Sequence, residues 1–219
     1  MTKKTIIVTG GSRGIGLSIV KSLLVDGYSV ISIARNSSSK NSQKLKKRYS
    51  DKFYNYDCDI SNYDDVKQVF KKINKKLKSI YGLINNAGIN PSRNVLHKTS
   101  IQDWRDTINT NVNGTFYVTN ECINNAIKNN KELVIINISS IAGLVSLKKR
   151  ASYSASKGAL ISLTKSIATD YAKKNIRCHC ICPAYISTEL TKPYLQKLSI
   201  KEHNELLSLH KLGKLGQVE

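Results

Sequence analysis

The chain has 219 residues, with 35 Lys and Arg against 15 Asp and Glu, so its formal net charge is +20 at pH 7. This length predicts a single domain, residues 1–219, and the sequence contains neither an apolar run long enough to span a bilayer nor a signal peptide. The lysines are spread along the chain without an aromatic-studded basic strand, which favours solvated helix faces over a surface for nucleic acid or membrane.

Strand and helix patterns alternate from the first residues. Strands are expected at short apolar runs that end at turn residues, and helices where apolar residues recur at helical spacing. The expected strands are residues 5–9, 28–34, 53–56, 81–85, 133–138 and 176–181. The expected helices are residues 15–25, 40–49, 63–77, 102–129 and 151–173, followed by a helical lid over the substrate at 189–212.

This order of elements predicts an α/β fold. Six strand–helix units imply a doubly wound parallel sheet of the Rossmann type, with helices on both faces and right-handed crossovers. Ligands of such sheets bind beyond the carboxyl ends of the strands. Functional residues are therefore expected directly after strands, and distinctive motifs do follow several of them.

A glycine-rich turn follows the first expected strand. It reads Thr9-Gly10-Gly11-Ser12-Arg13-Gly14-Ile15-Gly16 and leads into the first expected helix. Glycines permit a tight turn and the close approach of a pyrophosphate to backbone N–H groups, while the helix N-terminus attracts the anion. The turn alone is a weak signal, but its place between a strand and a helix is the one that a nucleotide-binding site requires.

Four more motifs follow in order along the chain. They are Asn85-Asn86-Ala87-Gly88, Asn111 in NTNVNG, Ser140 in NISSIAG, and Tyr153 with Lys157 in YSASK. Tyr153 and Lys157 are i and i+4 on one helix face, roughly 5–6 Å apart at Cβ. Together with the G-x-x-x-G-x-G spacing of the turn, these motifs resemble the short-chain dehydrogenase/reductase family over essentially the whole chain, and look closest to its 3-oxoacyl-[acyl-carrier-protein] reductases.

The resemblance implies a catalytic role for four residues. Tyr153 is the general acid that protonates a ketone oxygen, and Lys157 lowers the pKa of its phenol, because a nearby cation lowers such a pKa by about 1–3 units. Ser140, rather than the neighbouring Ser139, polarises the carbonyl oxygen. Asn111 binds a water that relays protons to Lys157. Without the other motifs, Asn111 would read as a helix-bending or loop asparagine.

The cofactor is argued from charge. NAD-using relatives carry an acidic residue at the end of the second strand, where this chain has Ala34 followed by Arg35, with Arg13 in the glycine turn. Two guanidinium groups and no carboxylate suit a 2′-phosphate, so NADP(H) is expected, with NAD(H) as the alternative. The residues implied to contact the cofactor are Gly10, Ser12, Arg13, Gly14, Ile15, Gly16, Arg35, Asp59, Ile60, Asn86, Ala87, Gly88, Tyr153, Lys157, Pro183, Ile186 and Thr188.

Near the sixth strand the chain departs from the family pattern. Ala184 stands where the family has glycine, and His179 stands where it has asparagine. Three cysteines alternate there, at Cys178, Cys180 and Cys182. Small buried side chains are expected rather than a metal site, so no metal is predicted. Five cysteines in all do not suggest a secreted disulfide framework, and a cytoplasmic protein is expected.

The substrate is a small carbonyl or alcohol compound by resemblance. Lys148, Lys149 and Arg150 precede Tyr153, and two interpretations stay open: a solvated basic loop, or a site for an anionic substrate or a carrier-linked arm. A non-catalytic NADP-binding sensor or scaffold is the competing class of function. The last family strand is expected to be absent, which leaves the strand at 176–181 as an open edge. We expect a homodimer through the helices that carry Asn111 and Tyr153, or a homotetramer.

Overall fold

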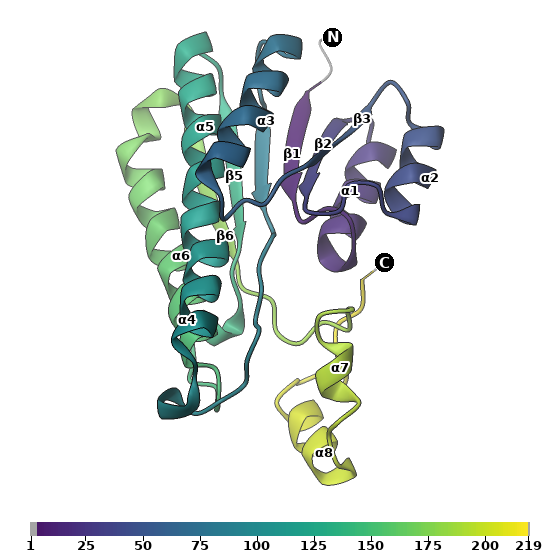
Figure 1. Cartoon of the computed structure of the whole chain (residues 1–219), viewed down its shortest axis with the longest axis vertical. Coiled ribbons are helices and arrows are strands. Elements are labelled where there is room, and N and C mark those ends of the chain that lie inside the picture. Colours follow the sequence, from purple (N-terminus) through teal and green to yellow (C-terminus); the bar gives the residue numbers. More distant parts are fainter. Residues whose placement is uncertain (1–3, 219) are drawn as a thin grey trace.

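A computed structural model describes residues 4–218, and six strands within them form one parallel sheet (Figure 1). The strand order is β3-β2-β1-β4-β5-β6. In this doubly wound order, strands are added first on one side of β1 and then, from β4 on, on its other side. The strands are β1 (Thr5–Thr9), β2 (Ser29–Ala34), β3 (Phe53–Asp57), β4 (Gly82–Asn85), β5 (Leu133–Ile138) and β6 (Ile176–Ile181). The predicted fold class is confirmed, and the expected strands agree to within one residue at each end.

Helices cover both faces of the sheet. They are α1 (Gly14–Val25), α2 (Lys40–Arg48), α3 (Tyr63–Lys76), α4 (Ile101–Ile108), α5 (Gly114–Asn129), α6 (Ala151–Asp170), α7 (Lys192–Leu195) and α8 (Ile200–Ser208). Short 3-10 turns are η1 (Leu96–Lys98), η3 (Ile141–Gly143) and η4 (Ala172–Lys174). No helix in the described part of the chain has the length and apolar character that a bilayer crossing needs.

Two apolar layers hold the helices against the sheet. One contains side chains of α3, α5 and α6 with Ile7, Ile31 and Leu83 from the strands, and the other contains side chains of α1 and α2 with Val8 and Val30. Successive residues of a strand point to opposite faces, so β1 contributes Ile7 to one layer and Val8 to the other. The sheet is therefore buried on both sides, which explains its continuous apolar strands.

The long helical region expected at 102–129 is present but irregular in the structure. A π-helical segment, η2 (Asn109–Asn113), separates α4 from α5. Such bulges are rare and occur often at functional sites. The expected lid at 189–212 also differs from a continuous helix, because it consists of two short helices, α7 and α8, that extend beyond the carboxyl end of the sheet (Figure 1).

Candidate active site

The main cleft lies at the carboxyl ends of the strands and has a volume of about 610 Å³. Seventeen of the nineteen predicted site residues line it: Gly10, Ser12, Arg13, Gly14, Ile15, Arg35, Asp59, Ile60, Asn86, Ala87, Gly88, Ser140, Tyr153, Lys157, Pro183, Ile186 and Thr188. Gly16 and Asn111 do not line the cleft, but they contact residues of its walls: Gly16 packs against Gly10, and Asn111 is hydrogen-bonded to Ile89. The sheet therefore brings together motifs that are far apart in the sequence.

The glycine turn forms one wall of the cleft. Gly10 has φ +67° and Gly14 has φ +53°, a backbone region that favours glycine. A Cβ on Gly16 would collide with the carbonyl oxygen of Gly10, so the turn can close only with glycine there. The N-cap of α1, Arg13, makes no side-chain capping bond and the first turn has no acidic residue, which leaves the positive helix end open to an anion.

The loop after β4 is fastened to this turn. Thr9 Oγ1 accepts hydrogen bonds from the backbone N–H groups of Asn86 and Ala87, both at 3.0 Å. Asn86 Nδ2 donates to the carbonyl oxygen of Thr9 at 3.0 Å. These bonds hold the two loops that flank the reversal point of the sheet at a constant separation, and thereby keep the cleft preformed.

The far end of the cleft is basic. Arg13 and Arg35 are exposed there, and Asn36, Ser39 and Asn41 line the same wall. The nearby carboxylates are occupied elsewhere. Asp57 accepts from the backbone N–H of Ser37 at 2.7 Å, and Asp59 accepts from the N–H and hydroxyl of Ser61 at 3.0 and 2.7 Å. This wall therefore presents guanidinium groups and neutral donors, a combination suited to phosphate.

Ser140 and Tyr153 face each other at the opposite end. Both side chains line the cleft, and Ser140 is close enough to the phenol to lower its pKa. Ser140 Oγ accepts from the backbone N–H of Ala142 at 3.2 Å. The neighbouring Ser139 also lines the cleft, but its hydroxyl is engaged elsewhere, since it donates to the backbone carbonyl of Lys157 at 2.8 Å. The structure thus places Ser140, and not Ser139, beside the phenol.

Burial raises the pKa of the Tyr153 phenol above its usual value. The Ser140 hydrogen bond and the positive charge of Arg150 lower the pKa in part, but they do not outweigh the loss of solvent. The sequence predicted a pKa lowered by Lys157, but the net direction is the opposite, because burial outweighs the nearby charges. The sequence shows that a lysine follows the tyrosine by four residues, but it does not show how deeply the phenol is buried, and burial raises the pKa of a phenol.

Lys157 is buried at 4% exposure, and burial lowers its pKa to about 8. Its Nζ donates to the carbonyl oxygen of Ile138 at 2.8 Å, and the same atom lies 5.7 Å from the centroid of the Tyr153 ring. A Cβ added to Gly88 would lie 3.4 Å from this ammonium group. The glycine therefore gives the cleft access to the lysine.

Asn111 is fully buried within η2. Its Oδ1 accepts from the backbone N–H of Ile89 at 2.8 Å, and its Nδ2 donates to the carbonyl of Ile89 at 3.0 Å and to Ser156 Oγ at 2.9 Å. The side-chain groups are thus occupied by the protein itself. They fix the loop after Gly88 against α6, and this placement identifies a positioning contact that the sequence did not predict.

The segment after β6 completes the cleft. Ala184 does not have the positive φ that would strain a residue with a Cβ, so the replacement of the family's glycine is tolerated there. Ile186 forms an isolated parallel bridge with Gly216, and the Ser187 N–H donates to the Gly216 carbonyl at 2.8 Å. Of the three cysteines near β6, Cys178 is buried as expected, but Cys180 and Cys182 are only half-buried. No group of three or more potential metal ligands occurs between residues 4 and 218.

A smaller cavity of about 70 Å³ adjoins the cleft at Ser140 and Tyr153. It is lined by Arg93 and Arg150 together with Tyr185, and Tyr194 packs against the arginines. In the sequence, Arg150 stands out only as one of three neighbouring cations. Nothing in the sequence marks Arg93, Tyr185 or Tyr194 as site residues. No motif marks them, because they come together only through the fold.

Comparisons with known proteins agree with this geometry. A family model described as short chain dehydrogenase matches residues 4–199. The 3-oxoacyl-[acyl-carrier-protein] reductase of Staphylococcus aureus is 33% identical over 220 residues, covering 98% of this chain and 85% of that protein. A 3beta-hydroxysteroid dehydrogenase of Mediterraneibacter gnavus is 33% identical over 191 residues, covering 87% of this chain and 68% of that protein. The structure of ElxO with NADP bound is 30% identical, with a TM-score of 0.88, and covers 99% of this chain and 87% of that one.

Proposed function

The chain belongs to the short-chain dehydrogenase family, and from this premise we propose that it is an NADPH-dependent reductase that converts a ketone to a secondary alcohol or catalyses the reverse oxidation. The coarser statement, an NAD(P)-dependent oxidoreductase acting on CH–OH or C=O groups, follows from the family and from the relatives named as reductases and dehydrogenases. The proposal assigns one NAD(P)-binding domain to residues 1–219, of which 1–3 and 219 lie outside the described part.

The residues of the main cleft fit a dinucleotide. The glycine turn and the open end of α1 suit a pyrophosphate, and Arg13 and Arg35 suit a 2′-phosphate where a carboxylate would suit an unmodified ribose. The NADP-bound structure of a neighbour supports the same cofactor. When bound, NADPH supplies the hydride that reduces the carbonyl carbon.

The remaining chemistry belongs to the chain's own residues. Tyr153 Oη holds the proton that the carbonyl oxygen takes up, and its raised pKa keeps the phenol protonated at neutral pH. Ser140, which lines the cleft beside that phenol, donates to the same carbonyl oxygen. Lys157 provides a buried positive charge next to the phenol, which stabilises the phenolate that remains. Asn111 keeps the loop after Gly88 in place against α6.

The observation that carries the proposal is the placement of Ser140, Tyr153 and buried Lys157 together at one end of a cleft that fits a nucleotide. NADPH oxidation against a panel of ketones and acetoacetyl thioesters tests it. Tyr153→Phe should lower kcat by about 10²–10⁴-fold and change NADPH affinity no more than a few-fold, because only the acid is removed. Near-normal turnover in this variant would contradict the mechanism. Tight NADPH binding without turnover of any substrate by the unchanged protein would favour a non-catalytic sensor.

We further propose a 3-oxoacyl thioester as one candidate substrate, supported by the S. aureus relative, although the steroid dehydrogenase shows how widely named substrates differ within the family. A homodimer through α4, α5 and α6 is proposed as the assembly, with a tetramer as the larger alternative. The absence of a spanning helix in residues 4–218 is compatible with the cytoplasmic location expected from the sequence.

A further inference from the structure

Arg150 is a buried charge for which the proposed chemistry has no use. Between residues 4 and 218, the buried charged side chains are Arg150, 7% exposed, and Lys157, 4% exposed. Both lie against the Tyr153 ring, with the Arg150 Cζ 6.0 Å from the ring centroid. Burial of a charge costs free energy unless it is paired or put to use. Lys157 has a role in the mechanism, so the burial of Arg150 requires a separate reason.

The partners of Arg150 are neutral. Its Nη2 donates to the hydroxyl of Tyr185 at 3.3 Å. With the Asn90 amide oriented so that Nδ2 donates to the carbonyl of Ser92, the Asn90 Oδ1 accepts from Arg150 Nη1. The rings of Tyr185 and Tyr194 have their centroids 5.9 and 5.6 Å from the Cζ. No carboxylate from the described residues pairs with Arg150, so its charge is not neutralised by this chain.

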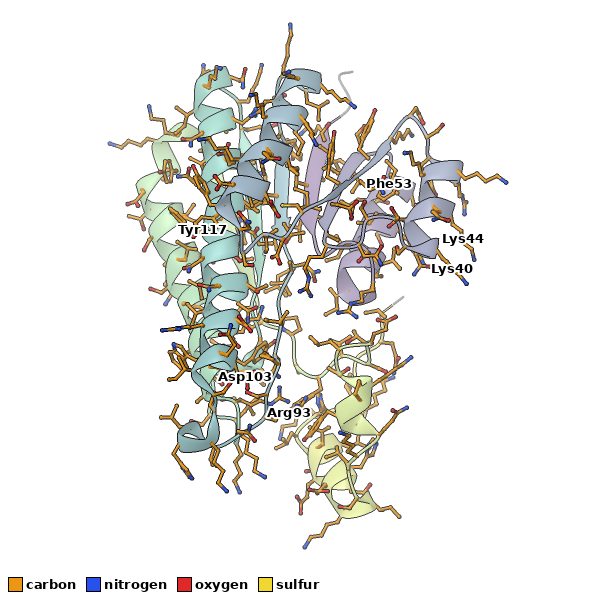
Figure 2. All side chains as sticks on the ribbon, viewed as in Figure 1. Lys40, Lys44, Phe53, Arg93, Asp103 and Tyr117 are labelled. Atoms are coloured by element: carbon orange, nitrogen blue, oxygen red, sulfur yellow. The ribbon has the colours of Figure 1, made fainter. Side chains whose placement is uncertain are left out.

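A second guanidinium group stands beside it. Arg93, on the connection between β4 and α4, is half-buried, and its Cζ lies 3.2 Å above the centroid of the Tyr194 ring (Figure 2). Burial lowers the pKa of Arg93, and the positive charge of Arg150 lowers it further. Two like charges that repel each other remain together here, and Arg93 also has no carboxylate partner between residues 4 and 218.

The two arginines share a cavity with the reacting residues. The cavity of about 70 Å³ is lined by Arg93, Arg150, Ser140 and Tyr153, and it opens into the main cleft through wall residues that both spaces share. Lys149, directly before Arg150, has φ +59°, an uncommon conformation for a residue with a side chain. The chain thus accepts a strained turn at the point from which Arg150 enters the site.

We propose that the substrate carries an anionic group close to its ketone, a carboxylate, sulfonate or phosphonate that Arg93 and Arg150 bind together, and this inference rests on the proposed reductase function. The guanidinium fork matches such oxygens, and the tyrosine hydroxyl of Tyr185 offers a further donor. The small volume restricts the bound group to a few heavy atoms. The preferred substrates are therefore keto acids, or the corresponding hydroxy acids in the reverse direction, ahead of neutral ketones and thioesters.

The position of the arginines also excludes the phosphate of a carrier-linked arm as the anionic group that they bind. A carrier arm has its phosphate many bonds away from the thioester. Since Ser140 and Tyr153 line the same small cavity as both arginines, a phosphate in that cavity cannot belong to such an arm while its ketone is at these two residues. The exposed Lys148 and Lys149, which precede Arg150, are outside the cavity and are not part of the proposed site.

The binding experiment uses paired ketones that differ only in charge. The pairs are 3-oxobutanoate and 4-oxopentanoate with their methyl esters, supplemented by 2-oxopropylphosphonate and 2-oxopropanesulfonate. Each is titrated calorimetrically into the free protein and into the protein saturated with NADP⁺, which cannot reduce them. At least one anionic ketone should bind about tenfold or more tightly than its neutral counterpart. Arg150→Met should reduce that affinity by about 30-fold or more, and Arg93→Gln by about tenfold.

The control variants test whether anion affinity depends on the charges that line the cavity or on any positive charge in the nearby loop. Lys148→Ser and Lys149→Ser remove positive charge from the same loop, and should change anion affinity less than twofold. Because Arg150 is buried, its variant is also checked by thermal melting, and half-buried Arg93 provides a second variant should Arg150→Met not fold. In steady-state assays with NADPH, the arginine variants should lose more kcat/KM with the keto acid than with the ester.

Three results would overturn the inference: esters that bind as well as their acids in every pair, arginine variants that lose both equally, or loop variants as damaging as Arg93→Gln. Reduction of neutral ketones without a preference for acids would refute the inference and leave the reductase function intact. Failure to reduce any ketone would refute the reductase function, while charge-dependent binding to the free protein would still report on the arginines.

Discussion

Tyr153 lies between two buried cations, and yet its pKa is raised. The explanation is that burial acts on the phenol more strongly than the charges of the arginines and the Ser140 hydrogen bond, which oppose it. Lys157 is buried in turn, and its own pKa of about 8 shows that its charge is only moderately stable there. Individual residues of this site are therefore tuned by desolvation at least as much as by their neighbours' charges.

The burial of Lys157 predicts a pH-dependent stability. The folded pKa of about 8 is below the ordinary value of 10.5, so between these values the unfolded chain binds the proton and the folded chain does not. The free energy of unfolding of the wild type should therefore rise with pH through this window relative to Lys157→Met, by on the order of 3 kcal/mol in all. Urea unfolding of both proteins at pH 7, 9 and 10.5 measures the difference, and a constant difference would show that the ammonium group is not desolvated.

Arg35 predicts the cofactor preference. Arg35→Asp removes a phosphate-binding charge and supplies a carboxylate for a ribose, so the ratio of kcat/KM for NADPH over NADH should fall about 100-fold. Lys44→Asp is the matched control, since Lys44 is exposed on the neighbouring α2 and does not line the cleft (Figure 2). Equal selectivity of Arg35→Asp and the wild type would mean that the 2′-phosphate binds elsewhere.

At the scale of elements, the π-helical segment η2 connects the core to the cleft. Thr115 Oγ1 donates to the backbone carbonyl of Asn111 at 2.8 Å, so the segment's irregular backbone is satisfied from within. Asn111 then holds the loop after Gly88 with both ends of its amide. An ordinary α-helix over these residues would rotate that amide away from the loop, because a π-turn inserts an extra residue.

Replacement of Asn111 should be costly. Asn111→Ala leaves the N–H and carbonyl of Ile89 without their partner, and each such group costs about 1–3 kcal/mol when it is kept from water. Ser156 Oγ loses a donor but still donates to the carbonyl of Tyr153 at 2.7 Å. We expect the free energy of unfolding to fall by about 2–4 kcal/mol and kcat to fall with it. Asn113→Ala, which removes only a hydrogen bond to Asn109 on the exposed side, should cost less than about 1 kcal/mol. Similar costs in chemical denaturation for the two variants would disprove the positioning role.

The sequence predicted the regular elements well and the irregular ones poorly. The bounds of β1, β5 and β6 agree residue by residue. Mainly apolar runs mark β1 and β5, because both faces of the sheet are covered there, whereas β6 alternates buried residues with exposed ones. The π-segment has no such periodicity and was expected as plain helix. In the site, motif spacing identified the residues around the cleft, but not that Arg150 is buried while Lys148 and Lys149 are exposed. Burial of a cation depends on tertiary packing, which the local pattern does not contain.

The whole molecule presents apolar side chains outside its two core layers. Trp104 on α4 is 38% exposed and Phe116 on α5 is 51% exposed, on helices proposed for the dimer. At the opposite edge, β6 pairs only with β5 within the described sheet, and its outer backbone groups are open to another strand. Both features favour the binding of one copy of the protein to another. Through the helices, two copies would pack side chains against each other, whereas through β6 they would form backbone hydrogen bonds.

Phe116 distinguishes these two routes. If the helices form the interface, Phe116→Lys should convert a dimer to a monomer in light scattering at micromolar concentration, because a lysine cannot be buried there without a partner. Leu209→Lys is a suitable control, since Leu209 is 70% exposed on the distant C-terminal side of α8. An unchanged dimer in the Phe116 variant would exclude this helix face as the contact.

The bridge between Ile186 and Gly216 has a practical consequence for handling the protein. The Gly216 N–H donates to the carbonyl of Tyr185 at 3.0 Å, so the chain passes the wall of the substrate cavity only a few residues before position 219. A bulky label attached near position 216 would lie beside the cleft and compete for space with incoming ketones. The first strand begins at the amino edge of the sheet, on the far side from the cleft (Figure 1). Labels and attachment points for biosensors therefore belong on that far side.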